Sequence, residues 1–188
     1  MIASALGFRA KTGHAIAVVL ALRDGVPSIE WRGEIGLTDP AVPQTAQPYH
    51  AVMELPWKDS EQRALRFVAA IEEAAAREIG ALRDALRSRG LSVVRVAVVG
   101  SADRDLAKIG NPHIRAHAAE GIAFRRAIEM ASKRLRLSCR SFPERTIVAM
   151  APAAKLAAFG KQVGAPWRAD QRAAAAAAWA VLAGGATR

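Results

Sequence analysis

The sequence predicts an α/β fold in which a mixed five-stranded sheet has helices on both faces, and three observations predict it. Residues 2–35 hold three apolar or alternating segments joined by short glycine turns, which is typical of consecutive antiparallel strands. The β-branched segment 91–100 and the shorter segment 137–142 each follow a helical pattern, so both are expected to be parallel strands. With 188 residues, 52% of them hydrophobic, the chain can bury a substantial core, and we expect a single domain over residues 1–188.

The first two strands are expected to meet at a polar turn, Arg9 to Gly13. The segment that follows, 15–22, is apolar on both alternating faces, as in a strand that lies between two covering layers. Arg23-Asp24-Gly25 predicts a hairpin turn. The alternation after it predicts a half-exposed third strand with three apolar side chains on one side: Ile29, Trp31 and Ile35.

A proline-rich stretch over 38–58 separates these strands from the first helix. Structureless stretches of about twenty residues are uncommon in compact domains and are usually functional or disordered. Tyr49 and His50 favour an ordered loop that crosses one face of the sheet. Asp59, with Gln62 three residues later, is the predicted start of a long amphipathic helix that ends at Gly90.

Asn111-Pro112 predicts the start of a second helix, because proline is favoured at the first helical position. The inward stripe of this helix is apolar from Phe124 onward but polar in its first two turns, where it carries His113, His117 and Glu120. A last, alanine-rich helix is expected from Arg168 to Leu182, ended by Gly184-Gly185. Its apolar surface is the predicted contact for a possible homodimer.

The charge of the chain is uneven. Residues 1–112 carry 14 Lys and Arg against 13 Asp and Glu, whereas residues 113–188 carry 13 against 4. A basic half of this kind suggests an anionic partner, most simply nucleic acid. The single cysteine, Cys139, excludes an internal disulfide, and with no secretory signal visible we expect a cytoplasmic protein without a membrane segment.

The order of elements, β-β-β-α-β-α-β-α, resembles the ribonuclease H-like superfold, and within it the RuvC-type Holliday-junction resolvases. That family begins with a strand reading Leu-Gly-Ile-Asp-Pro-Gly and a Thr-Gly shortly after, which resembles Leu6-Gly7-Phe8-Arg9-Ala10-Lys11-Thr12-Gly13 here. The family's late glycine and Lys-x-x-Val resemble Gly160-Lys161-Gln162-Val163, followed by Pro166 and the alanine helix. The small-residue turn Ala119-Glu120-Gly121 is also similar.

The resemblance implies a nuclease that holds two metal ions with four carboxylates, in the first strand, after the fourth strand and in the last helix. Two divalent ions about 4 Å apart need several anionic oxygens. Here the first-strand aspartate aligns with Arg9, and the last-helix pair falls near Ala174 and Ala177. Asp103 comes several residues late, and Asp170 about one helical turn early. We therefore expect that the catalytic carboxylates are missing and that the resolvase reaction is lost.

Two functional hypotheses remain open. The first is a non-catalytic, degenerate RuvC-like domain that binds nucleic acid or another polyanion through its basic C-terminal half. Contacts of this kind go to phosphates and carry no sequence information. The predicted binding residues are Arg9, Lys11, Arg115, Arg126, Lys133 and Arg136.

The second hypothesis is a metal-dependent hydrolase or nuclease with a relocated site at Asp103, His113, His117 and Glu120. Two histidines four residues apart on a helix can bind one metal ion, and a nearby carboxylate can act as ligand or base. The candidate metal ligands are His113, His117 and Glu120, and the candidate catalytic residues are Asp103, His117, Glu120 and His50. A divalent metal is the expected cofactor only here. Alternatively, these are hydrogen-bonded residues at the core boundary, with Glu120 paired to an arginine such as Arg9.

Overall fold

The computed structural model describes residues 1–183 and confirms the predicted mixed five-stranded sheet. The strands are β1 (Ile2–Lys11), β2 (His14–Arg23), β3 (Val26–Gly36), β4 (Leu91–Gly100) and β5 (Ser138–Pro143). Their spatial order is β3-β2-β1-β4-β5, with antiparallel pairing from β1 to β3 and parallel pairing of β1 with β4 and of β4 with β5. This order and these directions are those of the ribonuclease H-like fold.

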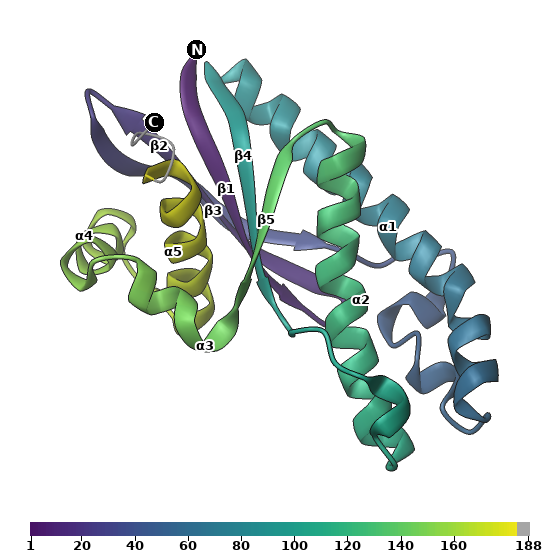
Figure 1. Cartoon of the computed structure of the whole chain (residues 1–188). Coiled ribbons are helices and arrows are strands. Elements are labelled where there is room, and N and C mark those ends of the chain that lie inside the picture. Colours follow the sequence, from purple (N-terminus) through teal and green to yellow (C-terminus); the bar gives the residue numbers. More distant parts are fainter. Residues whose placement is uncertain (184–188) are drawn as a thin grey trace.

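Helices cover both faces of the sheet (Figure 1). The long helices α1 (Trp57–Ser88) and α2 (Pro112–Arg134) lie together on one face, and α5 (Ala169–Ala183) lies on the other. Two smaller helices, α3 (Glu144–Ile147) and α4 (Ala153–Val163), connect β5 to α5. The predicted end of the last helix at Gly184-Gly185 lies outside the described residues. Within residues 1–183, no helix is both long and apolar enough to cross a membrane.

The alanine tract of α5 lies directly against β1. A Cβ atom on Gly7 would lie 1.9 Å from the carbonyl oxygen of Ala174, so only glycine allows this approach. All residues from 173 to 178 are buried, because small side chains let the helix axis come close to the sheet. The prediction that this helix offers an apolar surface to a second copy is therefore wrong for residues 173–178, because this tract already forms part of the core of its own chain.

β1 extends further than the sequence predicts. Arg9 and Lys11 belong to the strand and pair with Ile16 and His14 of β2, so only Thr12 and Gly13 form the turn. Gly13 has a positive φ of 82°, which glycine adopts without strain. On its other side β1 pairs with β4, and Arg9 lies in register with Val99. Arg9 is thus placed at the centre of the sheet, near its carboxyl-terminal edge.

The third strand contains a β-bulge that the alternation of its sequence does not reveal. Val19 pairs with Trp31 but the next residue of β2, Leu20, pairs with Ile29, so the register shifts between them. Because the side-chain period of a strand is two, such a shift moves apolar residues to the opposite face. Ile29 packs against α5, whereas Trp31 and Ile35 pack against the α1 and α2 layer. The prediction that all three share one face is wrong.

The proline-rich loop is ordered, as predicted, and contains 3-10 turns at Pro43–Ala46 and His50–Val52. It packs on α1 and α2, so the prediction that it crosses a face of the sheet is wrong. The helix after it begins at Trp57, two residues before the predicted cap Asp59. Ser60 lies in its first turn, and its hydroxyl donates to the carbonyl oxygens of Val52 at 2.8 Å and Leu55 at 3.0 Å. These bonds hold the loop against the start of α1, which fixes the position of His50.

Candidate functional site

The carboxyl end of β1 carries a buried arginine where the resemblance implies a metal-binding aspartate. Only 8% of the surface of Arg9 is exposed. Its Nη2 lies 2.6 Å from Oε1 of Glu144, and its Nε lies 3.5 Å from Oδ1 of Asp170. Lys11 also contacts Asp170, with Nζ 3.4 Å from Oδ2. The cations of β1 are therefore neutralised by acids from α3 and the first turn of α5.

A second buried arginine occupies the end of the neighbouring strand. Arg125 of α2 packs on Gly100, where an added Cβ would lie 3.0 Å from the Cβ of the arginine. Its Nε donates to the carbonyl oxygen of Ser101 at 2.8 Å, and Nη2 lies 2.5 Å from Oδ1 of Asp103. Nη1 of Arg125 pairs with Glu129, which also accepts from Ser141. Asp103 is thus held by guanidinium groups, and Arg126 reaches it as well at 3.2 Å.

These two arginines change what the sheet edge can do chemically. A two-metal site needs several carboxylate oxygens that are free to bind divalent cations. Here Glu144, Asp170 and Asp103 each contact a guanidinium instead. A cation placed between them would be repelled by Arg9 and Arg125, so the electrostatics of this edge oppose metal binding.

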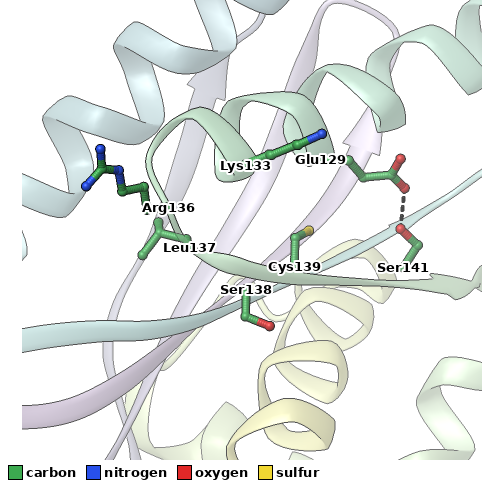
Figure 2. Close-up of a pocket in the computed structure, with 7 residues that line it drawn as sticks. All are labelled: Glu129, Lys133, Arg136, Leu137, Ser138, Cys139 and Ser141. Atoms are coloured by element: carbon green, nitrogen blue, oxygen red, sulfur yellow. Dashed lines mark hydrogen bonds between the residues drawn. The ribbon is translucent and has the colours of Figure 1, made fainter.

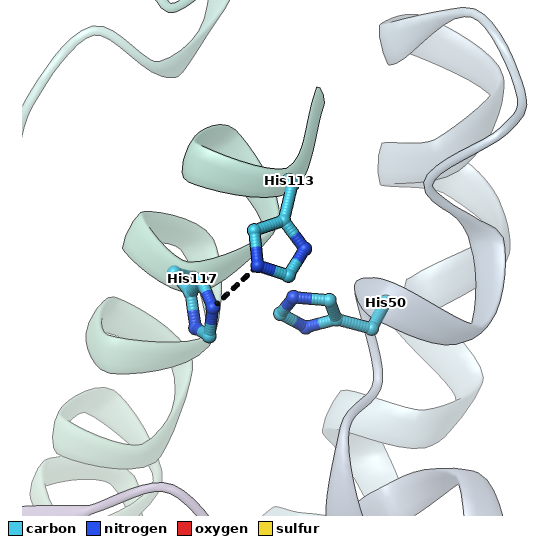
Figure 3. Close-up of side chains that lie close together, drawn as sticks. All are labelled: His50, His113 and His117. Carbon is cyan, nitrogen blue, oxygen red and sulfur yellow. Dashed lines mark hydrogen bonds between the residues drawn. The ribbon is translucent and has the colours of Figure 1, made fainter. Parts of the chain in front are cut away.

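The predicted polar stripe of α2 forms a separate cluster with the proline-rich loop. His113, His117 and His50 point toward one another, with ring centroids 4.4 to 4.8 Å apart (Figure 3). The Nε2 atoms of His113 and His117 are 3.1 Å apart. Each of the three rings offers a nitrogen, and these nitrogens all lie within 4.8 Å of one another.

Glu120 lies one turn further along α2 and is fully buried. Its Oε1 accepts from the backbone amides of Tyr49 at 3.2 Å and His50 at 3.1 Å, and it lies 2.8 Å from Nδ1 of His50. The expected pairing of Glu120 with Arg9 is wrong, because each has other partners. The structure brings His50, His113, His117 and Glu120 together, whereas Asp103 lies apart on the arginines.

The six predicted anion-binding residues do not form one surface. Arg9 and Lys11 contact acids at the end of β1, and Arg126 contacts Asp103. Arg115 lies in the first turn of α2, over the ring of Trp57 at 5.2 Å. Lys133 and Arg136 come at the other end of this 23-residue helix, which is about 34 Å long.

Lys133 and Arg136 both line an open pocket of about 620 Å³, with their charged ends pointing in different directions (Figure 2). The other residues that line it are Glu129, Leu137, Ser138, Cys139 and Ser141. Arg136 has a positive φ of 57° and ends α2 in a Schellman motif, in which Arg136 N donates to Lys133 O at 3.0 Å and Leu137 N to Ser132 O at 2.9 Å. Glycine is the usual residue at this left-handed position, so the arginine is held there against its backbone preference.

Cys139 lies on β5 in the same pocket and is partly buried. Burial raises the pKa of its thiol to about 11, which outweighs the opposing effect of a hydrogen bond with Ser132. A thiol with so high a pKa is a poor nucleophile, since the thiolate is the reactive form. Cys139 instead packs against the core on the α1 and α2 side of the sheet.

Sequence reasoning missed three charged residues of these sites. Arg125, Glu129 and Glu144 look like ordinary surface charges in the sequence, and no spacing marks them. Arg125 has one usable signal, because it lies one position from Phe124 on the apolar stripe of α2 and is therefore close to the buried face.

Comparisons with solved structures find similar folds at low sequence identity. RuvC of Thermus thermophilus, in complex with a Holliday junction substrate, has a TM-score of 0.49 at 12% identity, covering 94% of this chain and 91% of that one. A second Thermus thermophilus RuvC structure has a TM-score of 0.45 at 14% identity, covering 96% of each chain. A Ppx/GppA family member from Aquifex aeolicus has a TM-score of 0.38 at 10% identity, covering 80% of this chain and 38% of that chain. No protein-family model and no curated protein sequence matches the chain. In fold, the chain is similar to RuvC and to the Ppx/GppA family.

Proposed function

We propose that this protein is a ribonuclease H-like domain that binds nucleic acid through its basic C-terminal half. We also propose that the carboxyl-terminal edge of its sheet does not cleave the bound nucleic acid. The observation that carries the proposal is the unbalanced charge of the C-terminal half. Among residues 113–183, three of the four acidic side chains contact a lysine or arginine, namely Glu129, Glu144 and Asp170, and the fourth, Glu120, is buried beside His50. Of the twelve Lys and Arg in the same described stretch, nine contact no carboxylate.

Lysine and arginine side chains without acidic partners can pair with the phosphates of a nucleic-acid backbone. Each phosphate contact releases condensed counterions, so binding of this kind is sequence-independent and weakens steeply with salt. The pocket at Lys133 and Arg136 supports the proposal, because two such cations line it beside Ser138 and Ser141, although the hydroxyl of Ser141 donates to Glu129. Hydroxyl groups and basic side chains are the usual partners of phosphate oxygens.

The sheet edge supports the non-catalytic part of the proposal. Arg9 and Arg125 stand at the ends of β1 and β4, and the acids around them are bound to their guanidinium groups. Two-metal cleavage requires those acids to hold divalent ions. Positive charge already in that place favours binding without cleavage at this edge.

The experiment is a fluorescence-anisotropy titration of labelled single-stranded, duplex and four-way-junction DNA at several salt concentrations. We expect binding with a Kd of about 10⁻⁶ to 10⁻⁴ M at physiological salt and no cleavage with Mg²⁺ or Mn²⁺. The double variant Lys133→Ala, Arg136→Ala should weaken binding and reduce the slope of log K against log salt by about 2.

The matched control is the double variant Lys58→Ala, Arg83→Ala, which removes the same charge from the nearly neutral N-terminal half. It should leave the salt slope nearly unchanged. Equal effects of the two double variants would show attraction to net charge rather than a binding surface. Cleavage of the junction with Mg²⁺ would overturn the non-catalytic assignment, and heparin bound more tightly than every DNA would replace nucleic acid by another polyanion.

A further inference from the structure

We propose that His50, His113 and His117 form a three-histidine Zn²⁺ site in which Glu120 orients His50. This goes beyond the proposed nucleic-acid binding and uses different residues. The site lies at the start of α2, whereas the pocket lined by Lys133 and Arg136 lies at the end of the same helix. His117 and Lys133 are separated along the helix by about 24 Å. The imidazole side chains come from two segments that the fold brings together, since the loop at His50 precedes α1 (Figure 3).

The spacing of the ring nitrogens fits a tetrahedral ion. With Zn–N bonds of about 2.0–2.1 Å, two ligands of a tetrahedral site lie about 3.3–3.4 Å apart. The Nε2 atoms of His113 and His117 are 3.1 Å apart, and the nitrogen of His50 completes a set within 4.8 Å. His113 and His117 are exposed, so their rings can rotate to close the remaining distance without disturbing the core.

Glu120 settles which nitrogen of His50 is available. Its carboxylate oxygen Oε1 is an acceptor and lies 2.8 Å from Nδ1 of His50, so Nδ1 carries the proton. The lone pair is then on Nε2, which is buried and has no hydrogen-bond partner within the described residues. A buried imidazole nitrogen with a free lone pair that faces two other imidazoles is preorganised to bind a metal ion. Carboxylate–histidine–metal arrangements of this type fix both the tautomer and the ring orientation.

The charge of the cluster points the same way. A fully buried carboxylate needs a compensating positive charge, and no lysine or arginine among residues 1–183 contacts Glu120. A dication bound to the three imidazoles would supply that positive charge beside Glu120.

The donor set selects the metal. Three imidazole nitrogens suit Zn²⁺, whereas Mg²⁺ and Ca²⁺ require oxygen ligands. Three protein ligands leave the fourth tetrahedral position open to water. Because His113 and His117 lie at the surface, that position faces solvent.

The test uses the full chain without a histidine tag, freed of metal and titrated with Zn²⁺ against a chromogenic chelator. We expect one Zn²⁺ per chain, and tetrahedral d–d absorption when Co²⁺ replaces it. His113→Ala and His117→Ala should each weaken Zn²⁺ binding at least tenfold and abolish the Co²⁺ band. Both side chains are exposed, so these variants remain folded. Glu120→Gln should weaken binding by about 10- to 100-fold, as for other groups that orient metal ligands.

The chain supplies its own matched control in His14, the only histidine outside the cluster. His14→Ala should bind Zn²⁺ within twofold of the unchanged protein. The proposal is overturned by less than one Zn²⁺ per chain, by a loss in His14→Ala as large as in His113→Ala, or by Mg²⁺ binding as tightly as Zn²⁺. The titration contains no nucleic acid, so its failure would leave the nucleic-acid proposal untouched, and the reverse also holds.

Discussion

Nε of Arg9 lies 3.5 Å from Oδ1 of Asp170, which joins the carboxyl end of β1 to the first turn of α5. In the sequence, Asp170 lies about one helical turn before the positions where RuvC-type resolvases carry the acids of their last helix. In the structure it contacts position 9, where that family carries its first-strand aspartate. Glu144 reaches the same guanidinium from α3. Two acids therefore contact the side chain at position 9, and that residue sets the local charge at the end of β1.

The variant Arg9→Asp should convert this ion-pair network into a cluster of three carboxylates. Without divalent ions, like-charge repulsion and the lost pairs should lower the free energy of unfolding by about 1–3 kcal/mol, because Glu144 and Asp170 are themselves partly exposed. Mn²⁺ should restore part of that loss, since clustered carboxylates bind divalent cations. Thermal unfolding with Mn²⁺ and with a chelator measures both effects. Arg9→Leu is the control: it loses the same pairs, and equal stabilisation of it by Mn²⁺ would contradict the prediction.

Substitution of Gly7 by alanine should be strongly destabilising. The new Cβ would lie 1.9 Å from the carbonyl oxygen of Ala174 and 2.7 Å from the amide of Ala178, so β1 and α5 must separate. Overpacking of a core costs about 1–3 kcal/mol and sometimes more, and here both obstacles are backbone atoms. Urea denaturation measures the change. Gly36→Ala, which meets no atom within 4 Å, should stay within about 0.5 kcal/mol of the unchanged protein. Similar losses in the two variants would refute the close-approach argument.

Arg136→Gly should move stability and binding in opposite directions. Arg136 adopts a φ of 57° at the end of α2, and glycine occupies such a position without the penalty of a Cβ. We expect a gain of about 1 kcal/mol in the free energy of unfolding together with weaker binding of single-stranded DNA. Urea denaturation and fluorescence anisotropy on the same sample measure the two quantities. Arg136→Ala, which lacks the cation but keeps the Cβ, should weaken binding without the gain in stability. Unchanged DNA affinity in both variants would remove Arg136 from the binding surface.

The sheet was predictable from the sequence because hydrophobic periodicity and glycine turns indicate its strands. Asp24 and Gly25 both have positive φ, of 51° and 77°, as the hairpin signal predicts. The face of Ile29 was not predictable, because a β-bulge adds one residue to a strand without changing its composition. The start of α1 was missed for a similar reason, since Pro56 precedes it and its first turn carries no capping side chain.

The candidate sites were predictable only where helix geometry places residues. His113 and His117 are four residues apart, so α2 brings them together wherever it packs. The contact of His50 with both rings depends on the 3-10 turn at His50–Val52, whose position no pattern in the sequence specifies. The partner of Asp103 was missed because Arg125 reaches it from α2, and the sequence does not reveal how that helix crosses the end of β4.

Cys139 should react slowly with iodoacetamide in the folded protein. Burial raises the pKa of its thiol from 9.0 to about 11, so at pH 8 the thiolate should be about 100-fold rarer in the folded chain than in the unfolded one. Alkylation rates in buffer and in urea measure this ratio on the single cysteine. The folded chain also holds this proton more tightly, so stability should be fully present below pH 9.0 and decline between pH 9.0 and about 11. Cys139→Ala should lack that part of the decline. Equal alkylation rates in the two solvents would show that the thiol is not desolvated and that solvent reaches Cys139 on β5 in the folded chain.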